Sequence, residues 1–149
     1  MKVLIDSNVI LEVILQREEY EVANCLLERL HKDKHEMFMT VGSFYGMVYT
    51  VENYLRKVME LKKTERIEAL RSIMIQVLKQ YHVAGHDRES LLHAVNDGNF
   101  TDLEDSCQHQ AAVKAGCDCL ISFNMKDYAN GASMKAMTPQ EFLDSYLKN

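Results

Sequence analysis

Carboxylate and amide side chains occur at three separate places in this chain where an apolar run ends or a helical segment begins. They are Asp6, Asp102, Asp105, Asn124 and Asp127. Oxygen ligands of this kind, converging from distant parts of a chain, are those that Mg²⁺ and Mn²⁺ prefer. Water bound to such a cation loses its proton more readily and can attack a phosphodiester. The pattern therefore predicts a metal-dependent nuclease site.

The elements that position these residues follow from the hydrophobic spacing. Short apolar runs predict strands at 3–5, 37–41, 81–83 and 119–122, with an edge strand at 133–137. Helical spacing predicts helices over 9–15, 20–31, 42–57, 64–78, 89–95, 102–115 and from Thr138 or Pro139 onward. Strands alternating with helices predict a parallel sheet between helical layers.

Ligands of such sheets bind beyond the carboxyl ends of the strands. Asp6 directly follows the first strand, and Asn124 and Asp127 follow the strand at 119–122. Asp102 and Asp105 are three residues apart, so they share one face of the helix that leads into that strand. All three groups are therefore expected at the same edge of the sheet.

A purely structural role is the alternative for some of these carboxylates. Asp102 and Asp105 stand where a helix begins, and there a carboxylate caps free backbone amides and favours the positive end of the helix dipole. Asp6 is harder to explain in this way, because it ends an apolar strand and an unpaired buried carboxylate is costly. The ligand role is therefore favoured most strongly for Asp6.

Length and composition indicate one globular domain spanning residues 1–149. Hydrophobic residues make up 47% and charged residues 26% of the chain, which is ordinary for a globular protein. No apolar run approaches the roughly 18 residues that a membrane helix needs, and the N-terminus does not resemble a signal peptide. The expected location is cytoplasmic, with no membrane association.

The remaining chemistry-bearing residues favour structural roles. Cys25, Cys107, Cys117 and Cys119 form no CxxC pair, so we expect small, mostly buried thiols instead of a zinc site. His109 lies one turn after Asp105 and is expected to be packed or on the surface, and not to act as a general base.

The net charge of −5 gives no overall basic footprint for nucleic acid. The densest basic cluster is expected to be a solvated helix face, and local binding of RNA phosphates is its alternative role. Its members are Arg56, Lys57, Lys62, Lys63, Arg66 and Arg71.

Three blocks of the sequence carry a resemblance to a known family. They are VLIDSNVILEVIL at 3–15, FTDLEDSCQHQAAVKAGCDCLISFNMKDY at 100–128 and TPQEFLDSYL at 138–147. The chain resembles the PIN domain nucleases, which include the toxin component of VapBC-type toxin–antitoxin pairs. The resemblance implies a three-layer α/β/α sandwich with a central, mainly parallel sheet. It also implies a Mg²⁺- or Mn²⁺-dependent ribonuclease with RNA as substrate, an antitoxin as partner and association as a homodimer.

Carried over by position, the resemblance implies that Asp6 is the first acidic ligand, Asp105 the third with Asp102 beside it, and Asp127 the fourth. Asn124 and Ser7 would support them through hydrogen bonds. The family places another carboxylate early in the helix after the second strand. In MTVGSFYGMVYTVENYL (39–55) that position is Gly46. Glu52 lies about 9 Å further along the helix axis and is a poor substitute.

Gly46 leaves a second hypothesis open, namely a catalytically weakened or inactive PIN-like module that binds RNA or a protein partner. A weaker third one makes Asp6 a phosphatase nucleophile or a phospho-acceptor. Residue eight is Asn instead of the second Asp of a phosphatase, and Lys126 is the only lysine suited to a phospho-acceptor domain.

A homodimer face could include apolar residues of the helix after the second strand, and membership of the core is the alternative role for them. These residues are Phe44, Met47, Val48 and Tyr54.

Overall fold

The computed structural model describes residues 1–126, 128 and 133–147. Its centre is a five-stranded sheet with the order β3-β2-β1-β4-β5, in which every neighbouring pair is parallel. The strands are β1 (Lys2–Ile5), β2 (Glu36–Thr40), β3 (His82–Ala84), β4 (Cys119–Ile121) and β5 (Lys135–Met137). The predicted fold class, a helical sandwich around a parallel sheet, is confirmed.

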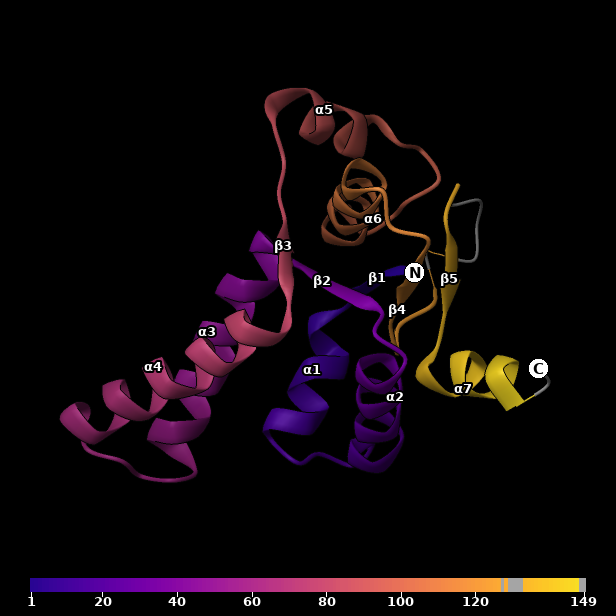
Figure 1. The fold of residues 1–149 in the computed structure, drawn as a ribbon. Coiled ribbons are helices and arrows are strands. Elements are labelled where there is room, and N and C mark those ends of the chain that lie inside the picture. The colour runs from indigo at the N-terminus through magenta and orange to yellow at the C-terminus, as the bar shows by residue number, and fades with distance from the viewer. Residues whose placement is uncertain (127, 129–132, 148–149) are drawn as a thin grey trace.

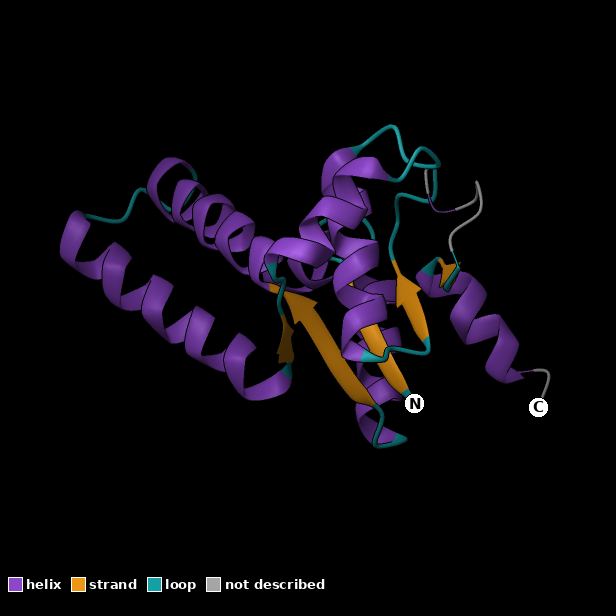
Figure 2. Ribbon diagram, turned by 90° about the horizontal axis from the view of Figure 1, so that it is seen from above, coloured by secondary structure: helices purple, strands orange, loops and turns teal. Residues whose placement is uncertain are grey.

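Seven helices of the described residues surround this sheet (Figures 1 and 2). They are α1 (Ser7–Ile14), α2 (Tyr20–Lys32), α3 (Val41–Lys57), α4 (Lys63–Gln80), α5 (Arg88–Asn96), α6 (Leu103–Ala115) and α7 (Pro139–Leu147). In Figure 1, α5 and α6 lie above the sheet, and α1, α2 and α7 lie below it. The α3–α4 pair projects sideways beyond the edge formed by β3 (Figure 2).

The central strand β1 is buried on both faces. Val3, Leu4 and Ile5 have no exposed surface. Val3 and Ile5 contribute to the core shared with α1, α2, α3, α4 and α7, whereas Leu4 contributes to the smaller core under α6. Alternate residues of a strand point to opposite faces of the sheet, so the two helical layers are joined through this short run.

Local hydrogen bonds explain where the helices near the site begin and end. The side chain of Thr40 accepts a hydrogen bond from the backbone N–H of Ser43, so α3 begins at Val41 and the second strand ends one residue earlier than predicted. Gly116 ends α6 in the left-handed conformation, with φ of 73°, as its position predicts.

Burial decides several of the alternatives raised by the sequence. Met47 is fully buried and both Phe44 and Val48 pack against the same core, so the core alternative is confirmed for these three residues. Cys117 and Cys119 are buried as expected, and burial raises the pKa of both thiols to about 11, whereas Cys107 is half-buried and Cys25 is exposed, against the expectation. The basic cluster of α3 and α4 is exposed except for the half-buried Arg66. No helix among the described residues is both long and apolar enough to cross a bilayer.

His109 is packed inside the molecule, one of the two places expected for it. Only 5% of it is exposed, and its ring centroid lies 5.2 Å from that of Phe100. Its Nε2 atom is buried with no hydrogen-bond partner among the described residues. Burial lowers the pKa of His109, and the charge of Asp97 only partly opposes this. The folded protein therefore holds this imidazole in its neutral form.

We expect this burial to make the protein less stable in mild acid. Because the pKa of His109 is lower in the folded state, its contribution to stability is complete above the unfolded pKa of about 6.5 and is lost as the pH falls below it. The free energy of unfolding by urea should decrease between about pH 7.5 and about pH 5.5, and less so for His109→Gln. His35 and His86, whose pKa values burial also lowers, retain their share in that variant. An identical decrease in both proteins would contradict this.

Candidate metal centre

Asp6 is held in a buried position directly after β1. It occupies the N-cap position of α1, yet its carboxylate caps none of the helix amides. Only 9% of the residue is exposed. The Ser122 hydroxyl donates to Oδ2 at 2.7 Å, and the Ser7 hydroxyl lies 3.4 Å from Oδ1. The local structure therefore directs this carboxylate toward the end of β4 instead of using it as a cap.

Ser122 connects the ends of β1 and β4 and was not predicted as a site residue. Its hydroxyl oxygen accepts from the Asn8 side-chain amide at 3.1 Å and from the Asn124 backbone N–H at 3.0 Å. The Asn124 backbone N–H can only donate. The Asn8 side chain also donates there, because its Oδ1 atom accepts from the Phe123 N–H and its NH₂ group therefore faces Ser122. The Ser122 proton must then point to Asp6. A serine at the end of an apolar strand was the available signal.

Asp105 approaches a buried phenol. The Tyr128 hydroxyl lies 3.3 Å from the Asp105 Oδ1 atom, and only 4% of Tyr128 is exposed. Burial first, and then the negative charges of Asp6 and Asp105, hold the pKa of this phenol above its ordinary value, so it is neutral. The structure thus places Asp105 at hydrogen-bond distance from Tyr128, and the charge of Asp6 also acts on this phenol.

Asp102 is the N-cap of α6, which agrees with its structural alternative. Its Oδ1 atom accepts from the backbone N–H groups of Glu104 at 2.9 Å and of Asp105 at 3.2 Å. The cap fixes the first turn of α6 and thereby the position from which Asp105 projects. Asp102 is exposed, as is Glu104. Asp102 is therefore a weaker candidate ligand than Asp6 or Asp105.

A polar hollow of about 410 Å³ lies at the start of α6. It is lined by Thr101, Asp102, Leu103, Asp105, Asn124 and Lys126. The structure therefore brings three predicted site residues, Asp102, Asp105 and Asn124, to one surface hollow, although Asn124 lies 19 residues after Asp105 in the sequence. Lys126 adds a cationic side chain to this acidic lining.

The set of carboxylates fits a cation only in part within the described residues. Asp127 lies outside them, and the remaining His, Cys, Asp and Glu side chains contain no group of three or more that could hold a metal ion. Among those residues, none of the ion pairs within 4.0 Å involves Asp6. Within the described part of the chain, the donors to the buried Asp6 carboxylate are hydroxyl groups, and a bound cation would stabilise such a carboxylate.

Gly46 leaves open space where the family resemblance calls for a carboxylate. It is exposed on α3, and a Cβ atom built there would meet no heavy atom within 4 Å. Glu52 does not replace it, since its carboxylate lies 3.9 Å from Arg66 of α4. The position therefore has room for a side chain that this chain does not supply.

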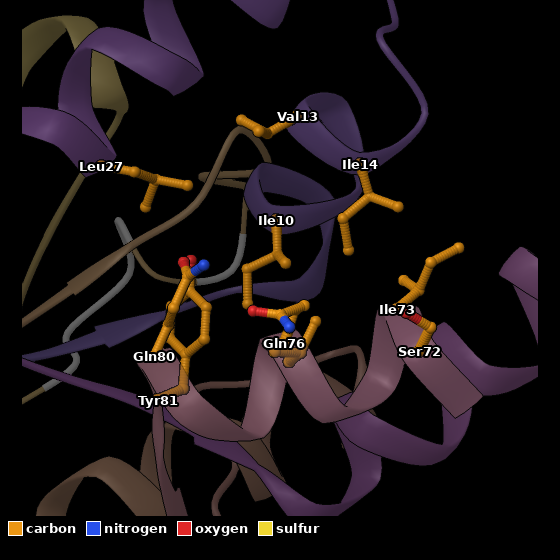
Figure 3. Close-up of a pocket in the computed structure, with 10 residues that line it drawn as sticks. Ile10, Val13, Ile14, Leu27, Ser72, Ile73, Gln76, Gln80 and Tyr81 are labelled. Atoms are coloured by element: carbon orange, nitrogen blue, oxygen red, sulfur yellow. The ribbon is translucent and has the colours of Figure 1, made fainter. Parts of the chain in front are cut away.

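A second concavity lies between α1, α2 and α4, away from these carboxylates (Figure 3). Its volume is about 330 Å³, and most of its lining is apolar. Ile10, Val13 and Ile14 come from α1, and Leu27 comes from α2. The α4 side consists of Ser72, Ile73, Gln76, Val77 and Gln80, and Tyr81 follows that helix. We refer to this concavity as the α1–α4 groove.

Comparison with known proteins gives consistent results. A family model described as PIN domain matches residues 2–126. Ribonuclease VapC1 of Aquifex aeolicus (strain VF5) is 25% identical over 149 residues, covering 97% of this chain and 95% of that protein. Similar solved structures include FitAcB from Neisseria gonorrhoeae, with a TM-score of 0.67, 14% identity and coverage of 93% of this chain and 98% of that chain. Another is VapBC2 from Rickettsia felis bound to a promoter DNA fragment, with a TM-score of 0.63, 14% identity and the same coverage. At these identities the solved structures support the fold alone.

Proposed function

This chain belongs to the PIN domain family, and we propose that it is a ribonuclease that uses a divalent cation held by Asp6 and Asp105. Asp127 would be a further ligand, and Mg²⁺ or Mn²⁺ suits an all-oxygen site. The observation that carries the proposal is the burial of Asp6, whose hydrogen-bond donors among the described residues are hydroxyl groups, together with the polar hollow that Asp105 lines. The similarity to a protein named ribonuclease VapC1 supports RNA as the substrate.

The chain's own residues orient the site. Ser122 directs one oxygen of Asp6, and the Asp102 cap fixes the start of the helix that carries Asp105. Lys126 lines the hollow beside Asp105, where its ammonium group could contact an RNA phosphate. The bound cation would neutralise charge on the phosphoryl oxygens and make a bound water more acidic.

Gly46 favours a second candidate function, a PIN-like module that binds RNA or a protein partner without cleaving RNA. A missing carboxylate lowers the affinity for the cation and places the attacking water less well. We therefore expect slow cleavage from the first candidate and none from the second.

A cleavage assay on structured and unstructured RNA separates these two candidates. We expect cleavage with Mg²⁺ or Mn²⁺, and its loss when the cation is chelated. Tight RNA binding without cleavage under all these conditions would favour the binding module instead.

The α1–α4 groove is proposed as the contact surface for an antitoxin. One structurally similar protein is a toxin–antitoxin complex from Klebsiella pneumoniae, with a TM-score of 0.65 and 14% identity. The groove offers an apolar concavity next to α4, and an apolar segment of a partner could bury its side chains there. This location leaves the hollow at the start of α6 open.

A charged residue in the groove should disrupt that complex. Any small protein encoded by a gene adjacent to that of this chain would be a candidate antitoxin, and Ile73→Glu should weaken its binding at least about 10-fold, because the substitution buries an unpaired charge. Ile75→Glu is the matched control, since Ile75 is 52% exposed on the same helix and does not line the groove. Binding is measured by titration calorimetry, with thermal unfolding as a folding check. Equal binding by both variants would exclude this surface.

A further inference from the structure

Asp105 is connected to the start of α3 by a chain of buried polar groups. Thr40, Ser43, Gln108 and Tyr128 are each less than 9% exposed. The Ser43 hydroxyl lies 3.1 Å from the Gln108 Oε1 atom, and the Gln108 Nε2 atom lies 2.9 Å from the Tyr128 hydroxyl. The chain ends at Asp105, 3.3 Å from that hydroxyl. Together these groups link β2, α3, α6 and the segment after β4.

Every hydrogen bond in this series of buried polar groups has a fixed direction. The Ser43 backbone N–H can only donate, and it donates to the Thr40 oxygen at 2.9 Å. The Thr40 hydroxyl then donates to the Ser43 oxygen at 3.0 Å, which leaves the Ser43 proton for Gln108. Gln108 donates its amide N–H to Tyr128, so the phenol proton must point to the Asp105 carboxylate.

We propose that Tyr128 is a positioning residue, which holds the Asp105 carboxylate in the orientation required for the cation by means of this directed chain. The inference rests on the proposed function, since it concerns the same site. Buried hydrogen bonds that all point one way polarise and strengthen one another. The phenol also donates to the Asp105 carboxylate without adding a charge of its own.

The chain of hydrogen-bonded groups reaches α3 close to the position of the absent carboxylate. Ser43, its member on α3, lies one turn before Gly46. The start of α3 therefore acts on the site through the orientation of Asp105 and contributes no ligand of its own there. The distance of 3.3 Å from phenol to carboxylate is longer than the usual 2.7–2.8 Å, and such bonds often tighten in the loaded state.

Tyr128→Phe tests the proposal, because it removes the hydroxyl and keeps the ring that packs edge-on to Phe100. We expect the affinity for Mn²⁺, measured by electron paramagnetic resonance of the free ion, to fall about 10-fold. At a fixed Mn²⁺ concentration, kcat for RNA cleavage should fall while KM for RNA is unchanged. Tyr20→Phe is the matched control, since Tyr20 is half-buried at the start of α2 and lines neither the α1–α4 groove nor the hollow beside Asp105, and it should change neither quantity.

Gln108→Leu provides a second test, because it removes the amide that orients the phenol and leaves Tyr128 in place. We expect the same direction of change, and a double variant that loses less than the sum of the two single effects. Thermal unfolding checks that each variant folds. If the parent binds Mn²⁺ and cleaves RNA and both variants match it, the positioning role is wrong and the proposed function stands. A parent that neither binds Mn²⁺ nor cleaves RNA overturns the proposed function, and the positioning role with it.

Discussion

Asp6→Asn and Asp105→Asn should each abolish RNA cleavage, lowering the rate by at least about 100-fold, or about 2.7 kcal/mol of transition-state stabilisation. The amide has almost the same shape as the carboxylate but carries no charge, so a cation is held far less well. Asp6 is the more sensitive of the two, since it is more deeply buried and its oxygens are oriented by Ser122 and Ser7. The measurement is the initial rate of cleavage at several Mg²⁺ and Mn²⁺ concentrations.

The controls for these variants concern folding and site specificity. Asp33→Asn removes a surface carboxylate that pairs with Arg29 at 2.7 Å. Asp33 lies between the end of α2 and the start of β2, and therefore at the edge of the sheet opposite to the site. It should cleave RNA at the parent rate. Thermal unfolding should show that Asp6→Asn remains folded, since removing a buried charge relieves repulsion from Asp105. Metal-dependent cleavage that survives both site substitutions would mean that another site, or a contaminant, is responsible.

Gly46→Glu should raise the cleavage rate about 10-fold, equivalent to about 1.4 kcal/mol. The position has space for a side chain, because a Cβ atom there meets no heavy atom within 4 Å. A carboxylate one turn beyond Ser43 would supply the acidic group that the family resemblance calls for early in α3. The same change should also stabilise the helix by about 0.5–1 kcal/mol, because Gly is a poor residue for a helix interior.

Two matched variants separate these effects. Gly46→Gln has the shape of Glu without its charge, and Gly46→Ala isolates the gain in helix stability. Both should raise the thermal unfolding midpoint by about 2–4 °C and leave the cleavage rate unchanged. An increase in rate with Gly46→Gln as large as that with Gly46→Glu would show that helix stability is responsible and that the missing carboxylate is not.

The order and type of the strands and helices could be predicted from the sequence because local signals agree along the chain. The fully buried run of β1 is a continuous apolar segment, and Gly116 marks the end of α6 by its left-handed conformation. The errors are at boundaries, as at Val41, where a side chain of the preceding residue caps the helix. Such a cap depends on one hydrogen bond and leaves little trace in hydrophobic spacing.

The candidate acidic residues of the site follow from the sequence, whereas the groups that contact them do not. Asp6 is recognisable because a carboxylate directly after an apolar strand is unusual. Asp105 is recognisable because it lies early in a predicted helix, on the same face as Asp102. Ser122, Gln108 and Tyr128 act through contacts between residues 20 to 116 positions apart, and these depend on the tertiary structure. The sequence also left the role of Asp102 open, and its two hydrogen bonds to backbone amides favour the capping role.

The most direct test of the central claim, that Asp6 and Asp105 share one cation, is a crystal structure of the protein soaked in MnCl₂. The anomalous difference map identifies the cation independently of any activity. We predict one strong peak bonded to oxygens of both Asp6 and Asp105, at the roughly 2 Å distances usual for such ions. A peak bonded to only one of these carboxylates, a peak elsewhere, or no peak at saturating Mn²⁺ would contradict the account.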